Sequence, residues 1–382
     1  MTAISAAMRQ FFIVFHRWAA LAALVFILLL GITGSALVFE GAMDRGLHPE
    51  LWRVHPSGRP LSLDTLVAHA RAAVPGPTPT GVTLSPVDDR ADVVQAGINQ
   101  IFVDPYTGHV LGHRTVAEWN ETLPRRLHVL HVTLMSGKIG GEIMAIATIV
   151  SLVLVLSGIY LWWGDKIWRV RWSASWKRVV FDLHHQLGIV AAIVLVLITA
   201  SGLVIHYRAL NNLVYRLDRT APEEILDQLT PASPSASISV DSLQAVALHA
   251  LPGARVMFLT LSPKRDDPFV AAMRFPEDHT PGGRSRVYVD RYTGAVLGVE
   301  NTRRAQMGTR IGNQIRSIHT GDWFGKPTEV VWLVAALALV GQAITGLLMW
   351  WNGRRSRAAL KRADAGRSGQ TRRDEHPEAV SV

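Results

Sequence analysis

Residues 187–205 read LGIVAAIVLVLITASGLVI, a run of 19 residues without a charged side chain. Three further runs have the same character, and they cover residues 18–39, 143–163 and 330–351 with 22, 21 and 22 residues. A helix of about 20 apolar residues crosses the roughly 30 Å hydrocarbon core of a bilayer. Because tryptophan and tyrosine gather at several ends of these runs, as they do at membrane interfaces, the sequence predicts four transmembrane helices.

The charged residues of the chain are unevenly distributed. Segments 1–17, 164–183 and 352–382 together hold 15 Lys and Arg against 6 Asp and Glu, whereas the rest of the chain holds 24 of each, so the whole net charge of +9 lies in these three segments. The positive-inside rule places them in the cytoplasm. The basic excess is therefore an orientation signal, and we expect a lipid bilayer around the protein and no nucleic-acid partner.

These patterns predict an α-helical membrane protein with two small α+β domains on its outer side. In each outer segment a helical pattern, at residues 61–74 and 240–251, precedes short strands, and about a hundred residues suffice for one small domain. In a bacterial inner membrane the outer side is the periplasm. The expected order is transmembrane helix 10–40, periplasmic domain 41–142, transmembrane helix 143–163, basic cytoplasmic loop 164–183, transmembrane helix 184–206, periplasmic domain 207–329, transmembrane helix 330–351 and a basic, disordered cytoplasmic tail 352–382.

The chain is a tandem duplication. VDPYTG at residues 103–108 recurs as VDRYTG at residues 289–294, and Val-Leu-Gly follows both copies. This pattern is typical of β-hairpins, so we interpret the two motifs as turns rather than as a site. The interval of 18 residues from His16 to Gly34 also separates His184 from Gly202. Both halves begin and end inside, which predicts parallel repeats related by an axis along the membrane normal.

Histidines are the candidate functional residues. Ionisable groups at membrane depth are costly and mark functional sites by default. The repeat superimposes His16 on His184 near the cytoplasmic face and His131 on His319 near the outer face. Three other histidines near the spans have no histidine counterpart, namely His128, His185 and His206.

The symmetry axis would bring each equivalent pair of histidines together at one membrane face. Two facing imidazoles between helices suit a six-coordinate haem iron. The chain has no cysteine, which excludes disulfides, Fe–S clusters, thiolate zinc sites and covalent C-x-x-C-H haem attachment. We therefore predict two non-covalent haem b groups, one held by His16 and His184 and the other by His131 and His319. Glycines in the spans fit close helix packing and a flat ring equally well.

The chain resembles the PepSY-associated transmembrane helix family over about residues 10–353. The motifs that carry the resemblance are Phe15-His16-Arg17-Trp18, Leu183-His184-His185-Gln186, the paired Asp-x-Tyr-Thr-Gly turns, His131 with Ser136-Gly137-Lys138, His319 with Phe324-Gly325-Lys326, and the terminal Trp-Trp pairs. Within that family it is similar to FoxB-type inner-membrane ferrisiderophore reductases, which act on ferrioxamine-like hydroxamate chelates. The resemblance implies haem ligands at His16, His184, His131 and His319, with His128, His185 and His206 as alternates. It also implies one-electron reduction of a periplasmic ferric siderophore, with release of Fe(II).

Two questions stay open in the sequence. No nucleotide-binding fingerprint occurs in the cytoplasmic parts, so we expect electrons from a separate cytoplasmic protein or from quinol. The basic tail fits such a donor and also fits anionic lipid. The alternative function is a non-enzymatic PepSY membrane protein that binds a partner protein or peptide, in an inhibitory or sensing role. A transporter fits less well, because few polar side chains lie near the midplane of the membrane: Ser151, Ser157, Thr199, Gln342 and Thr345.

Overall fold

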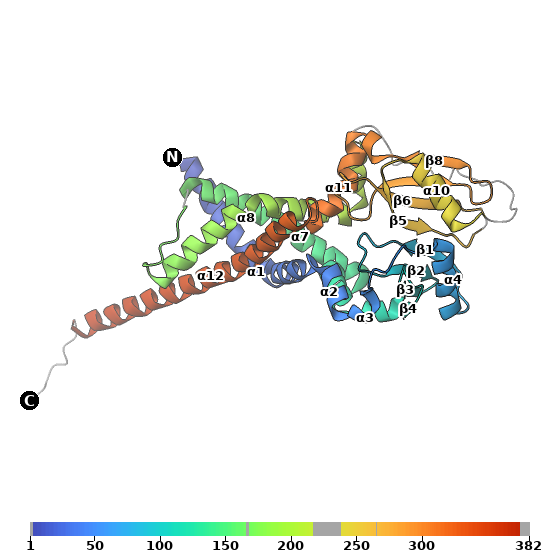
Figure 1. Ribbon diagram of the computed structural model, residues 1–382. Coiled ribbons are helices and arrows are strands. Elements are labelled where there is room, and N and C mark those ends of the chain that lie inside the picture. Colours follow the sequence, from blue (N-terminus) through green and yellow to red (C-terminus); the bar gives the residue numbers. More distant parts are fainter. Residues whose placement is uncertain (1–2, 166–167, 217–237, 265, 375–382) are drawn as a thin grey trace, which may run out of the picture. The chain divides into compact units, whose positions relative to one another are not determined.

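The computed structural model describes residues 3–165, 168–216, 238–264 and 266–374. Four long helices dominate it (Figure 1): α1 (Ala3–Leu37), α7 (Gly137–Asp165), α8 (Trp176–His206) and α12 (Lys326–Asp374). Each contains a stretch long and apolar enough to cross a bilayer, at Ala6–Leu37, Gly137–Trp163, Trp176–His206 and Lys326–Arg355. The expected fold class, four transmembrane helices with α+β domains, is confirmed, and the protein is a multi-pass membrane protein.

Helix ends differ from the expected boundaries, most of all at the start of α8 and at the end of α12. Helix α8 begins at Trp176, inside the segment expected to be a loop, and the buried carboxylate of Asp182 in its second turn binds Arg171 at 3.0 Å. Helix α12 continues to Asp374, so residues 352–374 are helical, and the expectation of a disordered tail is wrong there. This stretch has no proline and is rich in Arg and Ala, which are strong helix formers. The remainder of the tail, residues 375–382, lies outside the described residues, as do residues 166–167 of the loop and 217–237 of the second outer domain.

The chain divides into two compact units. The first consists of residues 1–32, 146–196 and 334–382 and contains parts of all four long helices. The second consists of residues 33–145 and 197–333 and contains the remaining parts of these helices, the strands and the short helices. The short helices are α2 (Glu40–Leu47), α3 (Pro49–Trp52), α4 (Leu63–Ala73), α5 (Val116–Glu121), α6 (Leu123–Thr133), α9 (Arg208–Arg216), α10 (Val240–Ala250) and α11 (Met307–Thr320), with a 3₁₀ turn at Thr302–Arg304.

The two outer domains share one antiparallel sheet. The first repeat provides β1 (Pro79–Thr83), β2 (Asp92–Ala96), β3 (Asn99–Val103) and β4 (Val110–Thr115), and the second provides β5 (Arg255–Thr260), β6 (Phe269–Arg274), β7 (Ser285–Val289) and β8 (Val296–Glu300). The strand order is β4-β3-β2-β1-β5-β6-β7-β8. Strands β1 and β5 join the repeats, with Val82 opposite Leu259 (Figure 1). The sequence indicated two α+β units, and pairing of their free edge strands makes them one body.

Helices α4 and α10 cover the same face of this sheet and pack on a common core. Each helix is capped by its own serine, Ser62 or Ser239, and also by the other repeat. The Asp241 carboxylate accepts the backbone N–H groups of Leu63 and Asp64 at 2.9 and 3.0 Å. Asp64 accepts those of Val240 and Asp241 at 3.0 and 3.2 Å. Carboxylates at helix N-termini are favourable, so this exchange stabilises the contact between the repeats.

The repeated Asp-x-Tyr-Thr-Gly motifs form hairpin turns, as the sequence predicted. Asp104 lies between β3 and β4, and its Oδ1 accepts the N–H groups of Tyr106 and Thr107. Gly108 then adopts a φ of +72°, which glycine tolerates without strain. Asp290 and Gly294 repeat the arrangement between β7 and β8.

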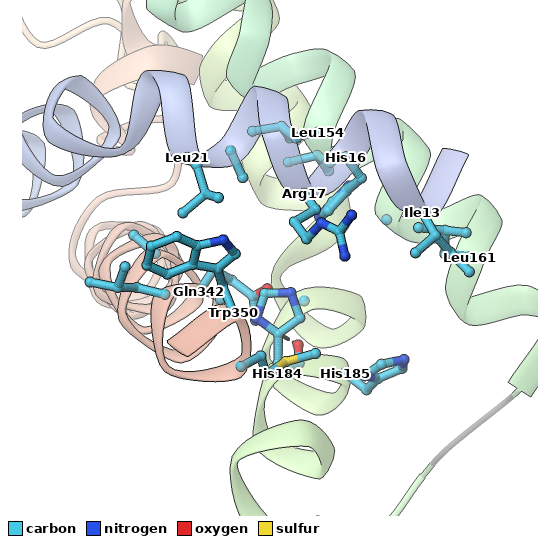
Figure 2. Close-up of a pocket in the computed structure, with 18 of the residues that line it drawn as sticks. Ile13, His16, Arg17, Leu21, Leu154, Leu161, His184, His185, Gln342 and Trp350 are labelled. Atoms are coloured by element: carbon cyan, nitrogen blue, oxygen red, sulfur yellow. Dashed lines mark hydrogen bonds between the residues drawn. The ribbon is translucent and has the colours of Figure 1, made fainter. Parts of the chain in front are cut away.

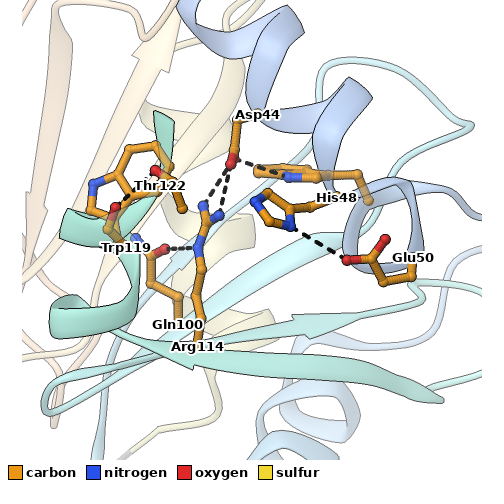
Figure 3. Close-up of polar contacts among 8 residues, drawn as sticks. Asp44, His48, Glu50, Gln100, Arg114, Trp119 and Thr122 are labelled. Atoms are coloured by element: carbon orange, nitrogen blue, oxygen red, sulfur yellow. Dashed lines mark hydrogen bonds and ion pairs between the residues drawn. The ribbon is translucent and has the colours of Figure 1, made fainter. Parts of the chain in front are cut away.

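A buried ion pair fixes the start of the first outer domain (Figure 3). Arg114 on β4 donates to both oxygens of Asp44 on α2, at 2.8 and 2.9 Å. Trp52 Nε1 donates to the same carboxylate, and Gln100 Oε1 accepts from Arg114 Nε at 2.9 Å. Because a bidentate arginine–carboxylate pair has a defined geometry, this cluster holds α2, the segment that follows the first transmembrane helix, against the sheet.

Candidate functional site

The structure brings His16 and His184 together within the first unit. His16 lies on α1 and His184 on α8, and their ring centres are 6.4 Å apart with the ring planes at 88°. A hydroxyl on a third helix holds each ring by its Nδ1 atom. His16 Nδ1 is hydrogen-bonded to Ser157 Oγ on α7 at 2.8 Å, and His184 Nδ1 to Thr345 Oγ1 on α12 at 2.9 Å.

His131 and His319 form a second pair within the other unit. Their ring centres are also 6.4 Å apart, with an angle of 52° between the planes. His131 Nδ1 is hydrogen-bonded to Thr33 Oγ1 at 2.8 Å. His319 Nδ1 donates to the carbonyl of Ile198 at 2.9 Å, with Ser201 Oγ at 3.3 Å. Burial, with a smaller effect of His319 and His128, lowers the pKa of His131 to about 3, so this imidazole is neutral at physiological pH.

Each of the four histidines also lies against a glycine. A Cβ placed on Gly34 would be 3.3 Å from His131 Cε1, and one on Gly202 would be 3.0 Å from His319 Cε1. The corresponding distances are 3.6 Å from Gly158 to His16 and 3.4 Å from Gly346 to His184. These glycines therefore make room for the imidazoles. Gly31 instead makes room for another helix, because its Cβ would meet Val340 at 2.7 Å.

In each of the four spans, a serine or threonine directly precedes the glycine that lies against a histidine. The sequence analysis did not single out this dipeptide. The four dipeptides are Thr33-Gly34, Ser157-Gly158, Ser201-Gly202 and Thr345-Gly346. Thr33 and Ser201 are equivalent in the two halves, as are Ser157 and Thr345, so each dipeptide belongs to one histidine of a matched pair. A Ser/Thr-Gly step recurring in all four spans could have identified these partners beforehand.

A cavity of about 910 Å³ adjoins His16 and His184 (Figure 2). Its wall is mostly apolar, from α1, α7, α8 and α12, and includes His185 and Gln342. Three arginines line it, Arg9, Arg17 and Arg354, and among the described residues no aspartate or glutamate does so. The Nε atom of Arg17 is buried and has no hydrogen-bond partner in the part of the chain that the structure describes. The cavity therefore offers an apolar slot with positive charge along it, in the size range of ligand pockets.

A family model described as the PepSY-associated TM region matches residues 14–353. The chain belongs to this family. No curated protein matches the chain. The matched range contains all four paired histidines, the four hydroxyl–glycine dipeptides and both halves of the sheet, so the site is part of the shared PepSY-associated region and not an addition to it.

The three alternate histidines of this PepSY-associated protein occupy other environments. His128 Nδ1 lies 3.1 Å from the carboxylate of Glu40, and His206 Nε2 lies 3.6 Å from that of Glu142. His185 Nδ1 is hydrogen-bonded to the Phe181 carbonyl at 3.0 Å, and its ring lies in the cavity wall. Within the described part of the chain, neither His128 nor His206 forms a facing pair with another histidine.

The separation of the two rings in each pair is compatible with a metal between them. Imidazole nitrogens bind transition metals at about 2 Å, and the ring centre lies about 1.2 Å behind the nitrogen, so two imidazoles on opposite sides of one metal have centres about 6 Å apart. Both pairs match that separation, at 6.4 Å. Among the described residues, no group of three or more His, Asp or Glu side chains converges to hold a metal ion. Two imidazoles suit an iron whose other four ligands come from a macrocycle, and the guanidinium of Arg17, whose Nε has no hydrogen-bond partner among the described residues, suits the propionates of that macrocycle.

Proposed function

We propose that this protein is a bacterial inner-membrane oxidoreductase with two non-covalent haem b groups, which passes electrons across the bilayer to a ferric siderophore. The observation that carries the proposal is the presence of two facing histidine pairs, His16 with His184 and His131 with His319. Each pair joins residues that are equivalent in the internal repeat, and the ring centres are 6.4 Å apart in both. Two histidine pairs of the same geometry suit two successive electron carriers on one path across the membrane.

The residues have separate roles in this proposal. His16 and His184 hold one haem, and His131 and His319 hold the other. Ser157, Thr345, Thr33 and Ser201 orient the imidazoles, and the arginines of the cavity bind propionates. When bound, a haem held by two imidazoles would supply one-electron transfer rather than oxygen chemistry. The mostly apolar wall of the cavity adjoins His16 and His184 and would surround the ring of a haem bound there.

The substrate class follows from the chemistry of iron chelates. Hydroxamate siderophores present hard oxygen donors, which hold Fe(III) far more tightly than Fe(II). One electron transferred to the ferric chelate gives Fe(II) and the intact chelator. The electron comes from a separate cytoplasmic protein or from quinol, in keeping with the absence of a nucleotide-binding fingerprint in the sequence. The basic segments support an orientation with both termini in the cytoplasm and the sheet in the periplasm.

An anaerobic redox spectrum of the purified protein tests the proposal. We expect two haem b per chain by pyridine haemochrome, a reduced α-band typical of bis-histidine ligation, and reoxidation of that band when a ferric hydroxamate is added. His16→Ala and His319→Ala should each remove about one haem. His109→Ala, in an exposed turn, is the matched control and should keep both.

Two results would contradict the proposal. If both ligand variants kept two haems, the assignment of ligands would be wrong. A colourless wild-type protein with freely replaceable histidines would instead favour the non-enzymatic alternative, in which the PepSY domains bind a partner protein or peptide.

A further inference from the structure

His206 belongs to a group of three polar side chains where α7 begins and α8 ends. Its Nε2 atom lies 3.6 Å from Oε1 of Glu142 on α7. The Tyr207 hydroxyl donates to Oε2 of the same carboxylate at 3.2 Å, and the rings of His206 and Tyr207 meet edge-on with their centres 4.7 Å apart. These three residues form what we call the His206 cluster. It combines imidazole and carboxylate, two of the ligands that bind first-row metals in proteins.

The other half of the chain has apolar residues in place of the His206 cluster. Under the register of the internal repeat, the equivalent positions are Val38 for His206, Phe39 for Tyr207 and Val330 for Glu142. Because the two halves share one scaffold, these helix ends form without polar side chains at the three positions. A histidine and a carboxylate at the end of a transmembrane helix, where the scaffold accepts valine, indicate a function.

The His206 cluster lies next to the outer histidine pair, in the same compact unit. A Cβ placed on Gly141 would be 3.4 Å from His206 Cε1 and 3.8 Å from the carbonyl oxygen of Val132. Val132 directly follows His131 on α6. His206 and the backbone of α6 beside His131 therefore approach the same point on α7. The side chains of His206 and Glu142 are 27% and 48% exposed, so solvent reaches them.

The spacing of the donor atoms suits one metal ion. Imidazole nitrogens and carboxylate oxygens bind such ions at about 2.1 Å, so two of them on one ion lie about 3.0–3.4 Å apart. The 3.6 Å between His206 and Glu142 exceeds this range slightly, and the half-exposed carboxylate has room to close the difference. The Tyr207 hydroxyl holds the other carboxylate oxygen, as partners of metal ligands do. The cluster therefore offers two ligands and leaves the other positions of the ion to water.

We propose that His206 and Glu142 form a binding site for a divalent first-row transition metal, with Tyr207 orienting the carboxylate. Mixed nitrogen and oxygen donors suit Fe(II), Co(II) or Zn(II) better than Mg(II) or Ca(II). The ion that occupies the site is the Fe(II) set free when the ferric chelate is reduced beside the outer histidine pair, an assignment that rests on the function proposed above. No electron moves at this site, because the ion only exchanges water for the two side chains.

Co(II) is the probe for this site, because it binds nitrogen and oxygen ligands more tightly than Fe(II) does. The full chain, without a histidine tag, is placed in phosphatidylcholine nanodiscs, and equilibrium dialysis measures the bound Co(II). The variants His206→Val, Glu142→Val and Tyr207→Phe give each position the residue type of the other half, so the helix ends should still fold. His48→Ala is the matched control, because His48 and Glu50 form another histidine–glutamate pair at 3.5 Å.

Wild-type protein should bind Co(II) in a way that depends on the cluster. Tyr207→Phe should weaken binding about tenfold, as expected when a partner of a metal ligand is removed. His206→Val and Glu142→Val should each weaken it more, because each removes a ligand. His48→Ala should bind as wild type does, and excess Fe(II), added without oxygen, should displace the Co(II).

Two results would overturn the site. The first is equal Co(II) binding by His206→Val, Glu142→Val and His48→Ala. The second is loss of a haem from His206→Val, which would make His206 a haem ligand instead. Co(II) that excess Fe(II) fails to displace would refute iron as the occupant. Wild-type protein that lacks haem and still binds Co(II) through the cluster would refute the proposed function and leave the metal site intact.

Discussion

Ser157 Oγ carries one hydrogen, which it donates to the carbonyl of Leu154 at 3.1 Å. Its bond to His16 must therefore use the hydrogen of Nδ1, which leaves the lone pair on Nε2. The same reasoning holds for His184, because Thr345 Oγ1 donates to the Gly341 carbonyl at 2.6 Å. His319 reaches the same tautomer through its bond to a carbonyl acceptor. A neutral imidazole with Nε2 free is the form that binds iron.

Removing one of these hydroxyls should weaken haem binding without removing a ligand. Ser157→Ala leaves His16 in place and removes the bond that orients it, so we expect about 10- to 100-fold lower affinity at that site. Haem retention during gel filtration, with titration of haem into the stripped protein, measures the effect.

Ser151→Ala is the matched control for this change. Ser151 is a buried serine on the same helix, and its hydroxyl donates to the Ala147 carbonyl at 2.8 Å. Equal loss of haem from the two variants would show that helix α7 tolerates neither change, and that the Ser157–His16 bond has no special role.

At the scale of elements, a buried ion pair holds the short helix α2 against the sheet. The Asp44–Arg114 pair joins α2 to β4, with 5% and 9% of the two side chains exposed (Figure 3). Arg114 also lies over the rings of Trp119, at 4.2 Å, and Phe102, at 5.0 Å. In the second repeat the corresponding strand carries Glu300, paired with Arg286 across β7 and β8. The two outer domains therefore share a topology and differ in the burial of their ion pairs, because the Asp44–Arg114 pair is buried whereas 42% of Arg286 and 27% of Glu300 are exposed.

Breaking the first of these pairs should destabilise the outer domain. Asp44→Ala leaves Arg114 as an unpaired buried cation, so we expect a loss of about 3 kcal/mol in the free energy of unfolding. The thermal midpoint of the detergent-solubilised protein measures it. Glu50→Ala is the control, because Glu50 is 64% exposed. Adding Arg114→Met to Asp44→Ala should recover part of the loss, and failure to recover would argue against the unpaired charge as its cause.

Strand β2 carries a carboxylate that should make stability depend on pH. Burial raises the pKa of Asp92 to about 6, in spite of its bond from the Ser85 N–H and the nearby Arg255. The folded protein binds this proton more tightly than the unfolded chain, whose Asp pKa is about 3.9. The protonated Asp92 therefore adds to the free energy of unfolding at low pH. This contribution of roughly 2–3 kcal/mol is lost as pH rises from about 4 to about 6.

Asp92→Asn should remove this contribution to the pH dependence. The measurement is the difference in thermal midpoint between wild type and Asp92→Asn at pH 4.5 and at pH 7.5, with the exposed Asp266→Asn as the control. Wild type should lose stability relative to the variant at the higher pH. A constant difference across the two pH values would contradict the raised pKa.

At the scale of the whole molecule, the absence of cysteine makes the orientation directly measurable. Ile98, in the turn between β2 and β3, is 65% exposed. With the sheet in the periplasm, a cysteine at Ile98→Cys should react with an impermeant maleimide in spheroplasts, and one at Arg355→Cys, at the end of the last span, only after lysis. The opposite labelling pattern would reverse the topology inferred from the basic segments.

Several features of this protein were decided by its sequence alone. Apolar length determines the four spans, because lipid requires about 20 residues of helix to satisfy the backbone. The internal repeat paired His16 with His184 and His131 with His319, since duplicated segments fold alike. The turns at Asp104 and Asp290 were readable because side-chain bonds over two or three residues depend only on local sequence.

Only the tertiary structure decided the features that depend on distant parts of the chain. The hydroxyls of Ser157 and Thr345 looked like isolated polar groups in the spans, and their histidine partners are 141 and 161 residues away. The joining of two domains into one sheet depends on the pairing of β1 with β5, which no local pattern records. The Thr280 hydroxyl meets the Asn313 carbonyl on α11 only because the loop between β6 and β7 folds back onto that helix. Such contacts arise from packing and burial in three dimensions, where the periodicity of a single segment carries no information.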